Sequence, residues 1–175
     1  HHSSAASDVY KRQAHDIRET FGRMAMNDYE TAALVAGGHT FGKSHGAASE
    51  SYKGPDPEAS KLQDQSTGWN SGYKSGKGVD TISSGIEGAW TQNPTKWDMG
   101  YLDCLYGHDW ELTKSPAGAH QWTPKKNGQK IKMVPDAHQK GVLHPPMMQT
   151  TDISMKVDPS YGPITKHFHQ NPKEF

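Results

Sequence analysis

His39 is the first residue whose type and setting could support chemistry. It follows Gly37 and Gly38 at the end of the apolar run 31–36. A histidine in such a place is more often a satisfied core residue than a ligand. The flanking glycines favour a ligand, because they let a bulky flat group approach the backbone and keep the imidazole clear of the helix surface. His39 is therefore a candidate ligand, and a packed core histidine is the alternative.

Two residues far along the chain could support such a ligand. A ligating histidine usually donates its other ring N–H to a carboxylate or carbonyl, which fixes the tautomer and raises the basicity of the ring. Asp152, near the start of a predicted helix, is the best candidate acceptor. A helix-capping aspartate is the alternative. Trp90 could donate its indole N–H to the same carboxylate, or it could simply pack in the core.

Other reaction chemistries have less support from residue spacing. His39 and His45 are six residues apart, and His167 and His169 are two apart. Neither spacing gives the i, i+4 histidine pair of zinc hydrolases, and the sequence has no C-x-x-C pair. Ser84 lacks the G-x-S-x-G context of a serine nucleophile. The sequence therefore favours neither a zinc site nor a serine triad.

The elements that must position these residues follow from apolar spacing and capping signals. Helices are predicted over 16–26, over 28–36 with Asn27 and Glu30 as a capping box, over 150–157 and over 158–169. The glycines at 37 and 38 are expected to end the second of these. A shorter helix fits 57–65, and 81–90 fits a helix or a strand. Short strands are predicted around 110–112 and 121–123, within loops over 43–80 and 91–146.

Both ends of the chain differ from this pattern. Residues 1–13 have no apolar periodicity, so we interpret them as a tag or artefact outside the fold. Residues 171–175 resemble the opening of a helix, with Asn171 as N-cap and Pro172 at the first position. We therefore expect that the chain is part of something longer.

Composition narrows the class of protein. The chain has 175 residues, and its hydrophobic content of 32% is low for a self-contained domain. The 18 glycines and 11 prolines predict many loops. Charges balance at 19 basic and 19 acidic residues, which gives no case for nucleic acid or a membrane surface. No membrane span or targeting signal is visible, so cytoplasm is the default location. Cys104, the single cysteine, is expected to be a buried small hydrophobe.

Seven strings taken together resemble one known family. They are DIRETF (16–21), RMAMND (23–28), GGHTFGKSHG (37–46), DTISSGIE (80–87), NPTKW (93–97), WELTKSPAGAHQW (110–122) and TTDIS (150–154). In order and approximate spacing they look like the catalase-peroxidases, bifunctional enzymes of the class I haem peroxidases. The resemblance runs from about residue 14 to the last residue.

This resemblance implies a mainly α haem peroxidase fold, with long loops and a few short β-strands. Residues 14–175 would form the proximal half of its N-terminal haem domain, incomplete at both ends. His39 would be the iron ligand of haem b, Asp152 the acceptor of its N–H, and Trp90 a tryptophan hydrogen-bonded to that aspartate. Met24 would be the methionine of a Met–Tyr–Trp covalent adduct that catalase activity requires.

The resemblance also implies residues that line the haem. Besides His39 and Trp90 they are Gly38, Lys43, Ser44, His45, Ser83 and Ser84. Ser84 matches a serine at the narrow access channel near a haem propionate. A loop hydroxyl that caps the following turn is the alternative for Ser84.

For the parent enzyme, the resemblance implies breakdown of hydrogen peroxide to water and oxygen, and oxidation of small-molecule electron donors. Its partners would be the remainder of the parent chain and further copies, as a homodimer or homotetramer. The family's distal arginine, tryptophan and histidine, and the adduct tyrosine, would lie before residue 14. The 175 residues alone are thus expected to be inactive. A non-catalytic fragment that at most binds haem and a monofunctional class I peroxidase remain as alternatives.

Overall fold

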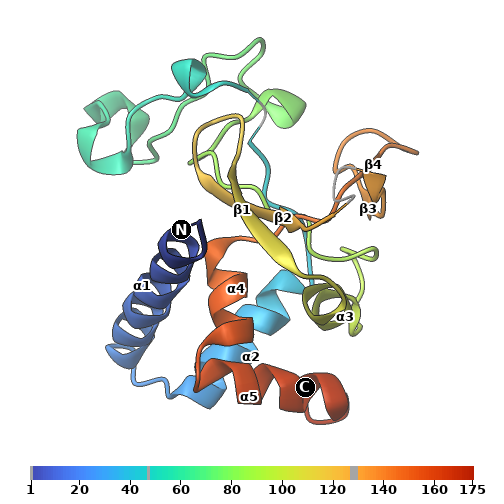
Figure 1. The fold of residues 1–175 in the computed structure, drawn as a ribbon. Coiled ribbons are helices and arrows are strands. Elements are labelled where there is room, and N and C mark those ends of the chain that lie inside the picture. The colour runs from blue at the N-terminus through green and yellow to red at the C-terminus, as the bar shows by residue number, and fades with distance from the viewer. Residues whose placement is uncertain (1, 47, 127–129) are drawn as a thin grey trace.

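A computed structural model describes residues 2–46, 48–126 and 130–175. Within these residues the chain has five α-helices and four short strands (Figure 1). The helices are α1 His2–Gly22, α2 Asp28–His39, α3 Gly100–Gly107, α4 Thr150–Val157 and α5 Tyr161–Gln170. The strands are β1 Trp110–Lys114, β2 His120–Pro124, β3 Val134–Pro135 and β4 Leu143–His144. The expected mainly α class, with long loops and short strands, is confirmed.

The helices enclose two neighbouring apolar clusters. One lies where α1, α2, α4 and α5 meet, and its buried members are Ala14, Ile17, Ala32, Val35, Met155 and Tyr161. The larger one joins α3 and the β1–β2 hairpin to α2, α4 and α5. Its buried members are Ala36, Trp90, Tyr101, Leu102, Cys104, Leu105, Trp110, Trp122, Met148, Ile153 and Phe168. The five α-helices and the β1–β2 hairpin therefore contribute to two neighbouring apolar clusters, and the long loop over 43–80 contributes to neither.

The second helix begins as its sequence predicts. The Glu30 N–H donates to Asn27 Oδ1 at 2.9 Å, and the Asn27 N–H donates to Glu30 Oε2 at 3.0 Å, which completes the capping box. The expected end at the two glycines is wrong, because α2 continues through them to His39. The Thr40 N–H and hydroxyl both donate to the Ala36 carbonyl, which holds this last turn helical. His39 is thereby fixed on a helix rather than on a glycine turn.

The two predicted strands form an antiparallel hairpin. Its register places Leu112 opposite Trp122, and Trp122 also exchanges both backbone hydrogen bonds with Met148. This second pairing ties the hairpin to the segment that leads into α4. The hairpin lies across the helices in the middle of the molecule (Figure 1).

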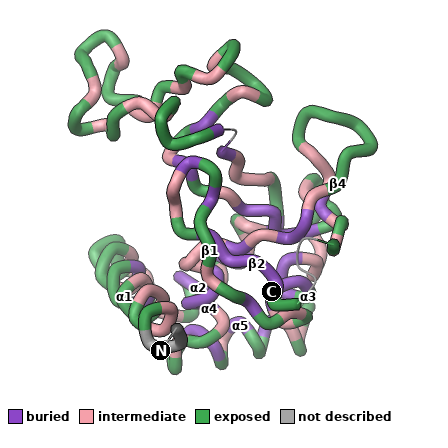
Figure 2. The backbone as a smooth tube through the Cα atoms, turned by 45° about the horizontal axis from the view of Figure 1, so that its top comes forward, coloured by how far each residue is buried: buried purple, intermediate pink, exposed green. Residues whose placement is uncertain are grey.

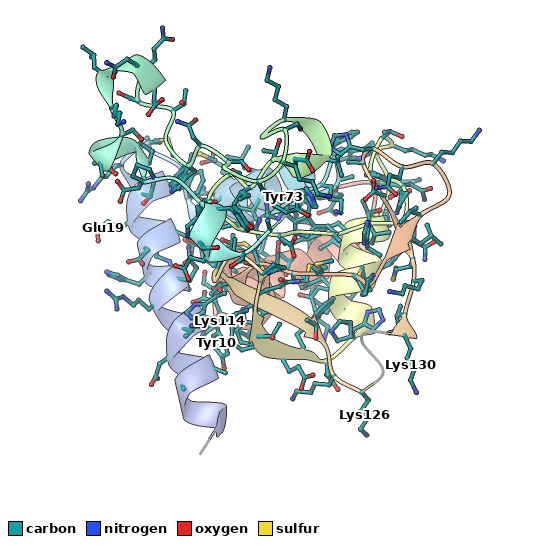
Figure 3. The ribbon with its side chains drawn as sticks, turned by 90° about the horizontal axis from the view of Figure 1, so that it is seen from above. Tyr10, Glu19, Tyr73, Lys114, Lys126 and Lys130 are labelled. Carbon is teal, nitrogen blue, oxygen red and sulfur yellow. The ribbon has the colours of Figure 1, made fainter. Side chains whose placement is uncertain are left out.

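The first helix is longer than predicted. It starts at His2 instead of near residue 16, so residues 2–13 are not outside the fold. The Ser154 hydroxyl donates to the Tyr10 carbonyl at 2.7 Å, and the Tyr10 ring lies 6.2 Å from that of Trp122. Figure 3 shows Tyr10 where α1 faces the hairpin. Tertiary contacts therefore stabilise a stretch that lacks apolar periodicity.

Several other predictions of local structure are wrong. The expected loop over 91–146 contains α3, and 57–65 forms two separate turns of 3-10 helix, η2 Pro57–Ala59 and η3 Leu62–Asp64. Residues 81–90 form neither a helix nor a strand, but Gly88 and Ala89 make single bridges to Ser44 and Met147. Residues 171–175 form a turn after α5, where Asn171 is the C-cap and not an N-cap.

The loop over 43–80 rises away from the helices and is mostly exposed (Figure 2). It also carries the 3-10 turns η1 Glu50–Tyr52 and η4 Gly78–Asp80. A small cluster of Ala48, Ile82 and Ala117 attaches its base to the hairpin turn. Lys126 and Lys130 extend into solvent at the opposite edge (Figure 3). None of the helices that the structure describes is long and apolar enough to cross a membrane.

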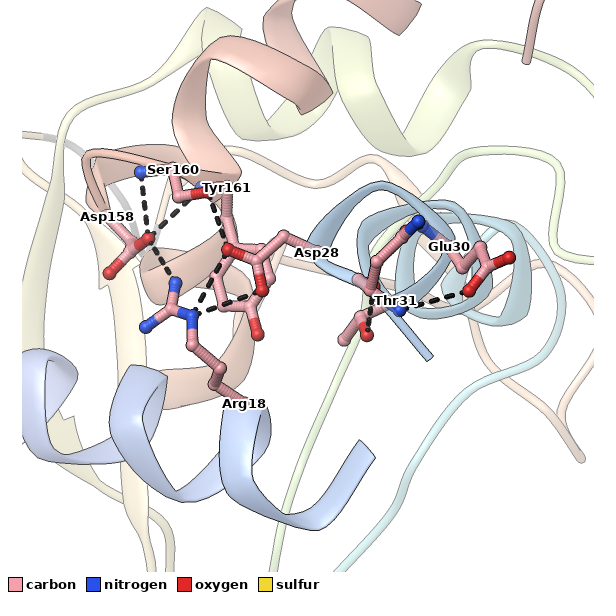
Figure 4. A network of polar contacts seen from close by, with 8 residues as sticks. Arg18, Asp28, Glu30, Thr31, Asp158, Ser160 and Tyr161 are labelled. Atoms are coloured by element: carbon pink, nitrogen blue, oxygen red, sulfur yellow. Dashed lines mark hydrogen bonds and ion pairs between the residues drawn. The ribbon is translucent and has the colours of Figure 1, made fainter. Parts of the chain in front are cut away.

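An ionic network joins three helices at the end of the molecule away from this loop. Arg18 of α1 donates to both carboxylate oxygens of Asp28 at 3.1 Å and to Asp158 at 2.8 Å (Figure 4). Asp28 is the first residue of α2, and Asp158 accepts from the N–H groups of Ser160 and Tyr161 at the start of α5. The network therefore fixes the start of α2 and of α5 against α1.

Candidate cofactor site

The site is built around the buried carboxylate of Asp152, in the first turn of α4. Its Oδ1 lies 2.6 Å from His39 Nδ1 and accepts from the Tyr101 hydroxyl at 2.7 Å. Its Oδ2 accepts from Trp90 Nε1 at 2.8 Å and from the Gln149 N–H at 2.7 Å. Asp152 has no exposed surface, so these four donors replace water around both oxygens. One carboxylate thus joins α2, α3, α4 and the segment that carries Trp90.

These contacts keep the Asp152 carboxylate ionised. Burial alone would raise the pKa of Asp152, but the His39 charge and the hydrogen bonds from His39, Tyr101 and Gln149 outweigh it and lower the pKa. Asp152 is then ionised and can only accept, so His39 Nδ1 must carry a proton. In the neutral imidazole the lone pair is therefore on Nε2. This tautomer leaves Nε2 free to bind a metal.

Trp90 fixes the plane of the imidazole. Its ring stacks on that of His39, with centroids 4.0 Å apart and 14° between planes. The indole approaches the backbone so closely that a Cβ at Gly88 would collide with it. Gly88 also pairs with Ser44, five residues after His39. The glycine therefore allows one short segment to pack against the Trp90 indole and to pair with the chain just after His39.

His39 lies on the wall of a pocket of about 710 Å³. The lining residues are Gly38, His39, Phe41, Gly42, Lys43, Ser44, His45, Gly78, Thr81, Ser83, Trp90, Ala137 and His138. A Cβ built at Gly38, Gly42 or Gly78 would meet only open space. Because three glycines leave the wall bare, a broad flat group could lie against the backbone beside His39.

The rest of the wall supplies polar groups. Lys43 provides an amino group, and Ser44, Thr81 and Ser83 provide hydroxyls. Burial, followed by the charge of Lys43, lowers the pKa of His45. Burial also raises the pKa of Glu87, which accepts from the Gly46 N–H at 3.3 Å. The pocket thus combines the imidazole of His39 with donors suited to the carboxylates of a ligand.

The structure brings most of the predicted site residues together. Gly38, His39, Lys43, Ser44, His45, Ser83 and Trp90 line the pocket, and Asp152 lies behind His39. Ser84 is half-buried in the adjacent turn and does not line this pocket. Met24 lies in the turn after α1 with 56% of its surface exposed, although its helical spacing alone predicts a core residue.

Sequence reasoning missed two groups of contributors. Thr81, Ala137 and His138 line the pocket from loops whose path the sequence does not reveal. Tyr101 was missed because its surroundings were interpreted as loop. The apolar positions 101, 102 and 105 have helical spacing, and that signal would have placed Tyr101 in a buried first turn.

The chain is similar in sequence to known peroxidases. The family model described as "Peroxidase" matches residues 2–171. The chain is 63% identical over 161 residues to a catalase-peroxidase of Koribacter versatilis, which covers 91% of this chain and 21% of that protein. The catalase-peroxidase of Maridesulfovibrio salexigens is 61% identical over 160 residues, 91% of this chain and 22% of the relative. That of Gloeobacter violaceus is 59% identical over 162 residues, 92% and 22%. The chain therefore spans about a fifth of the length of these curated relatives.

Proposed function

Because this chain belongs to the peroxidase family, we propose that it forms the iron-ligating side of the haem b site of a catalase-peroxidase, with His39 as the ligand. The complete protein would break down hydrogen peroxide to water and oxygen and oxidise small electron donors. The observation that carries this proposal is the pair His39–Asp152, joined at 2.6 Å beside a pocket of about 710 Å³.

The residues present fit such a group. The Asp152 carboxylate holds the His39 proton on Nδ1 and leaves the Nε2 lone pair for a metal. Gly38, Gly42 and Gly78 leave room for a flat macrocycle, and Lys43 with the nearby hydroxyls suits its carboxylates. Haem supplies the redox chemistry with peroxide, and a negatively polarised histidine ligand favours O–O cleavage by it.

Each of these residues has a distinct task in the proposal. Asp152 accepts the His39 N–H and so raises the electron donation of the imidazole. Trp90 donates to the same carboxylate and keeps the imidazole plane fixed by stacking. Ser44, His45 and Ser83, which line the pocket, would lie along the haem edge, and Ser84 would lie in the turn next to it.

The direct test is replacement of the ligand in the full-length protein. His39→Gly should abolish the haem Soret band at its native position, and added imidazole should restore it by entering the space that the side chain leaves. His167→Gln, on the exposed face of α5, is the matched control and should retain haem. Full haem loading and an unchanged spectrum in His39→Gly without imidazole would disprove the assignment.

Met24 tests the catalase part of the proposal. An exposed thioether can reach a residue outside this segment, as the proposed adduct with a tyrosine and a tryptophan requires. Met24→Ile in the full-length protein should reduce catalase activity by more than tenfold and leave donor oxidation within about twofold. Assay of both activities in one preparation checks this. Equal loss of both would indicate a structural role and would contradict the adduct.

We further propose that the 175 residues alone bind haem without turning over peroxide. Proton transfer on peroxide needs an acid–base residue on the other face of the haem, and the family resemblance assigns that residue to a segment before residue 14. A Soret band without measurable oxygen release is the expected result for this chain.

A further inference from the structure

Tyr101 is a third side chain on the carboxylate that orients His39. Its hydroxyl donates to Asp152 Oδ1 at 2.7 Å, the same oxygen that lies 2.6 Å from His39 Nδ1. Tyr101 is fully buried, and its ring stands edge-on to the imidazole, with centroids 5.8 Å apart and planes at 84°. The tyrosine therefore touches both members of the pair.

The backbone around Tyr101 is held in place by a hydrogen bond and by close packing. Tyr101 is in the first turn of α3, where the Gly100 N–H donates to Asp98 Oδ1 at 2.8 Å. A Cβ at Gly100 would collide with the Thr91 hydroxyl, next to Trp90. Thr91 is itself fully buried. The start of α3 is thereby packed against the segment that carries Trp90, and the phenol has little freedom to leave Asp152.

Two donors on one carboxylate oxygen compete for its negative charge. A hydrogen bond from a hydroxyl to an ionised acceptor is short and strong, and it stabilises charge that would otherwise attract the second donor. The phenol thus weakens the pull of Asp152 on the His39 proton. Trp90 and the Gln149 N–H act on the other oxygen, so Tyr101 is the neutral donor that competes most directly with the imidazole.

We propose that Tyr101 is a positioning residue that limits how much imidazolate character Asp152 gives to His39, and so sets the reduction potential of the bound iron. This rests on the proposed function, because it requires His39 to be the iron ligand. Without the phenol, the His39–Asp152 hydrogen bond would shorten. More electron density would then reach the iron, which favours its ferric state.

The test compares two tyrosine-to-phenylalanine variants in the full-length, haem-loaded protein. Tyr101→Phe keeps the ring and removes only the hydroxyl on Asp152. Tyr106→Phe, also on α3, removes a hydroxyl that contacts Thr165 at 2.7 Å and is the matched control. In Tyr101→Phe the ferric/ferrous midpoint potential should fall and the iron–histidine stretching frequency should rise. Both quantities should match wild type in Tyr106→Phe.

A third measurement does not need haem. The His39 Nδ1 proton should give a low-field NMR signal in the apoprotein, and Tyr101→Phe should move it further downfield as its bond to Asp152 shortens. An unchanged potential together with an unchanged proton shift would overturn the proposal, and so would a rise in potential. Failure of the proposed function would give a different result. If His39 is not the iron ligand, wild type has no iron–histidine stretch that disappears in His39→Gly.

Discussion

At the scale of single residues, Asp152 is a buried carboxylate that depends on its hydrogen-bond donors. Its two oxygens accept from four donors, and the residue has no exposed surface. Asp152→Ala should lower the free energy of unfolding by about 3–5 kcal/mol, because buried donors on His39, Trp90 and Tyr101 lose their acceptor. Urea denaturation of the haem-free protein measures this loss.

The matched variant is Ser154→Ala, two residues further along α4. Its hydroxyl is also buried and bonds only to backbone carbonyls, of Tyr10 and Thr150. We expect a loss of about 1 kcal/mol there. A loss at Asp152 no larger than that at Ser154 would show that the four contacts contribute little to the fold.

Gly88 provides an independent residue-scale test. A Cβ at this position would overlap the Trp90 indole, so Gly88→Ala should displace the ring from His39 and Asp152 and cost about 1–3 kcal/mol. The Trp90 Nε1–H signal in NMR should shift markedly. Gly107→Ala, where a Cβ meets only open space at the end of α3, should leave stability and this signal nearly unchanged. If Gly88→Ala and Gly107→Ala gave the same result, the indole would be able to move aside without loss of stability.

Residue types alone offered three candidates for this site and left core packing and helix capping as alternatives. His39, Asp152 and Trp90 were predicted from ligand chemistry, since a ligating imidazole needs a carboxylate and a buried carboxylate needs donors. Tyr101 was not predicted, because the sequence does not reveal which group a tyrosine hydroxyl bonds to. Its bond to Asp152 spans 51 residues and exists only once α3 packs against α4.

At the scale of elements, prediction succeeded where local signals agree with the fold. The capping box of α2 and the strands of the hairpin carry such signals, and both were predicted. The first half of α1 carries none: its helix is stabilised by contacts such as Ser154 to the Tyr10 carbonyl. The end of α2 was wrong because Thr40 satisfies the Ala36 carbonyl, which outweighs the weak helix preference of the two glycines.

The Arg18 network gives a prediction at this scale. Burial alone would raise the pKa of Asp158, but hydrogen bonds from the Tyr161 and Ser160 N–H groups and from Arg18 lower it. A carboxyl whose pKa is lower in the folded state stabilises the fold above its unfolded pKa of ~3.9, and this contribution is lost as pH falls through the folded value. The network should therefore weaken only in acid.

Asp158→Asn is the variant that isolates this charge. Its amide can still accept from the start of α5, so we expect a loss of only about 1 kcal/mol at pH 7. The difference from wild type should shrink below pH ~4 and close at lower pH. Urea melts at several pH values measure it, with the exposed Glu58→Gln as control. A difference that stays constant with pH would exclude the ionic contribution.

At the scale of the whole molecule, the buried apolar residues are concentrated in the helices and the hairpin, which explains the low apolar content of the whole. The core is continuous across four helices and the hairpin, whereas the loop over 43–80 adds only one small cluster. Large apolar side chains also remain partly exposed along α2 and just after it, at Tyr29, Leu34 and Phe41. Phe41 and His39 both line the pocket, so bound haem would extend the core that the chain builds alone.

This arrangement predicts that haem stabilises the chain by mass action. A ligand that binds only the folded state adds about 2.7 kcal/mol at a concentration 100 times its Kd, and about 1.4 kcal/mol for each further tenfold. For a chain of this size each kcal/mol corresponds to about 2–4 °C in Tm. Thermal unfolding followed by circular dichroism should therefore show a Tm that rises with haemin concentration.

The same titration with His39→Gln separates ligation from adsorption. Haemin also binds to exposed apolar surface, and the partly exposed side chains along α2 offer such surface in both proteins. Ligation through His39 requires the Tm rise to fall by several degrees in His39→Gln, whereas adsorption would give equal rises. Equal rises would mean that this chain does not form the iron site by itself. The pocket beside His39 would then need the rest of the parent protein to hold its haem.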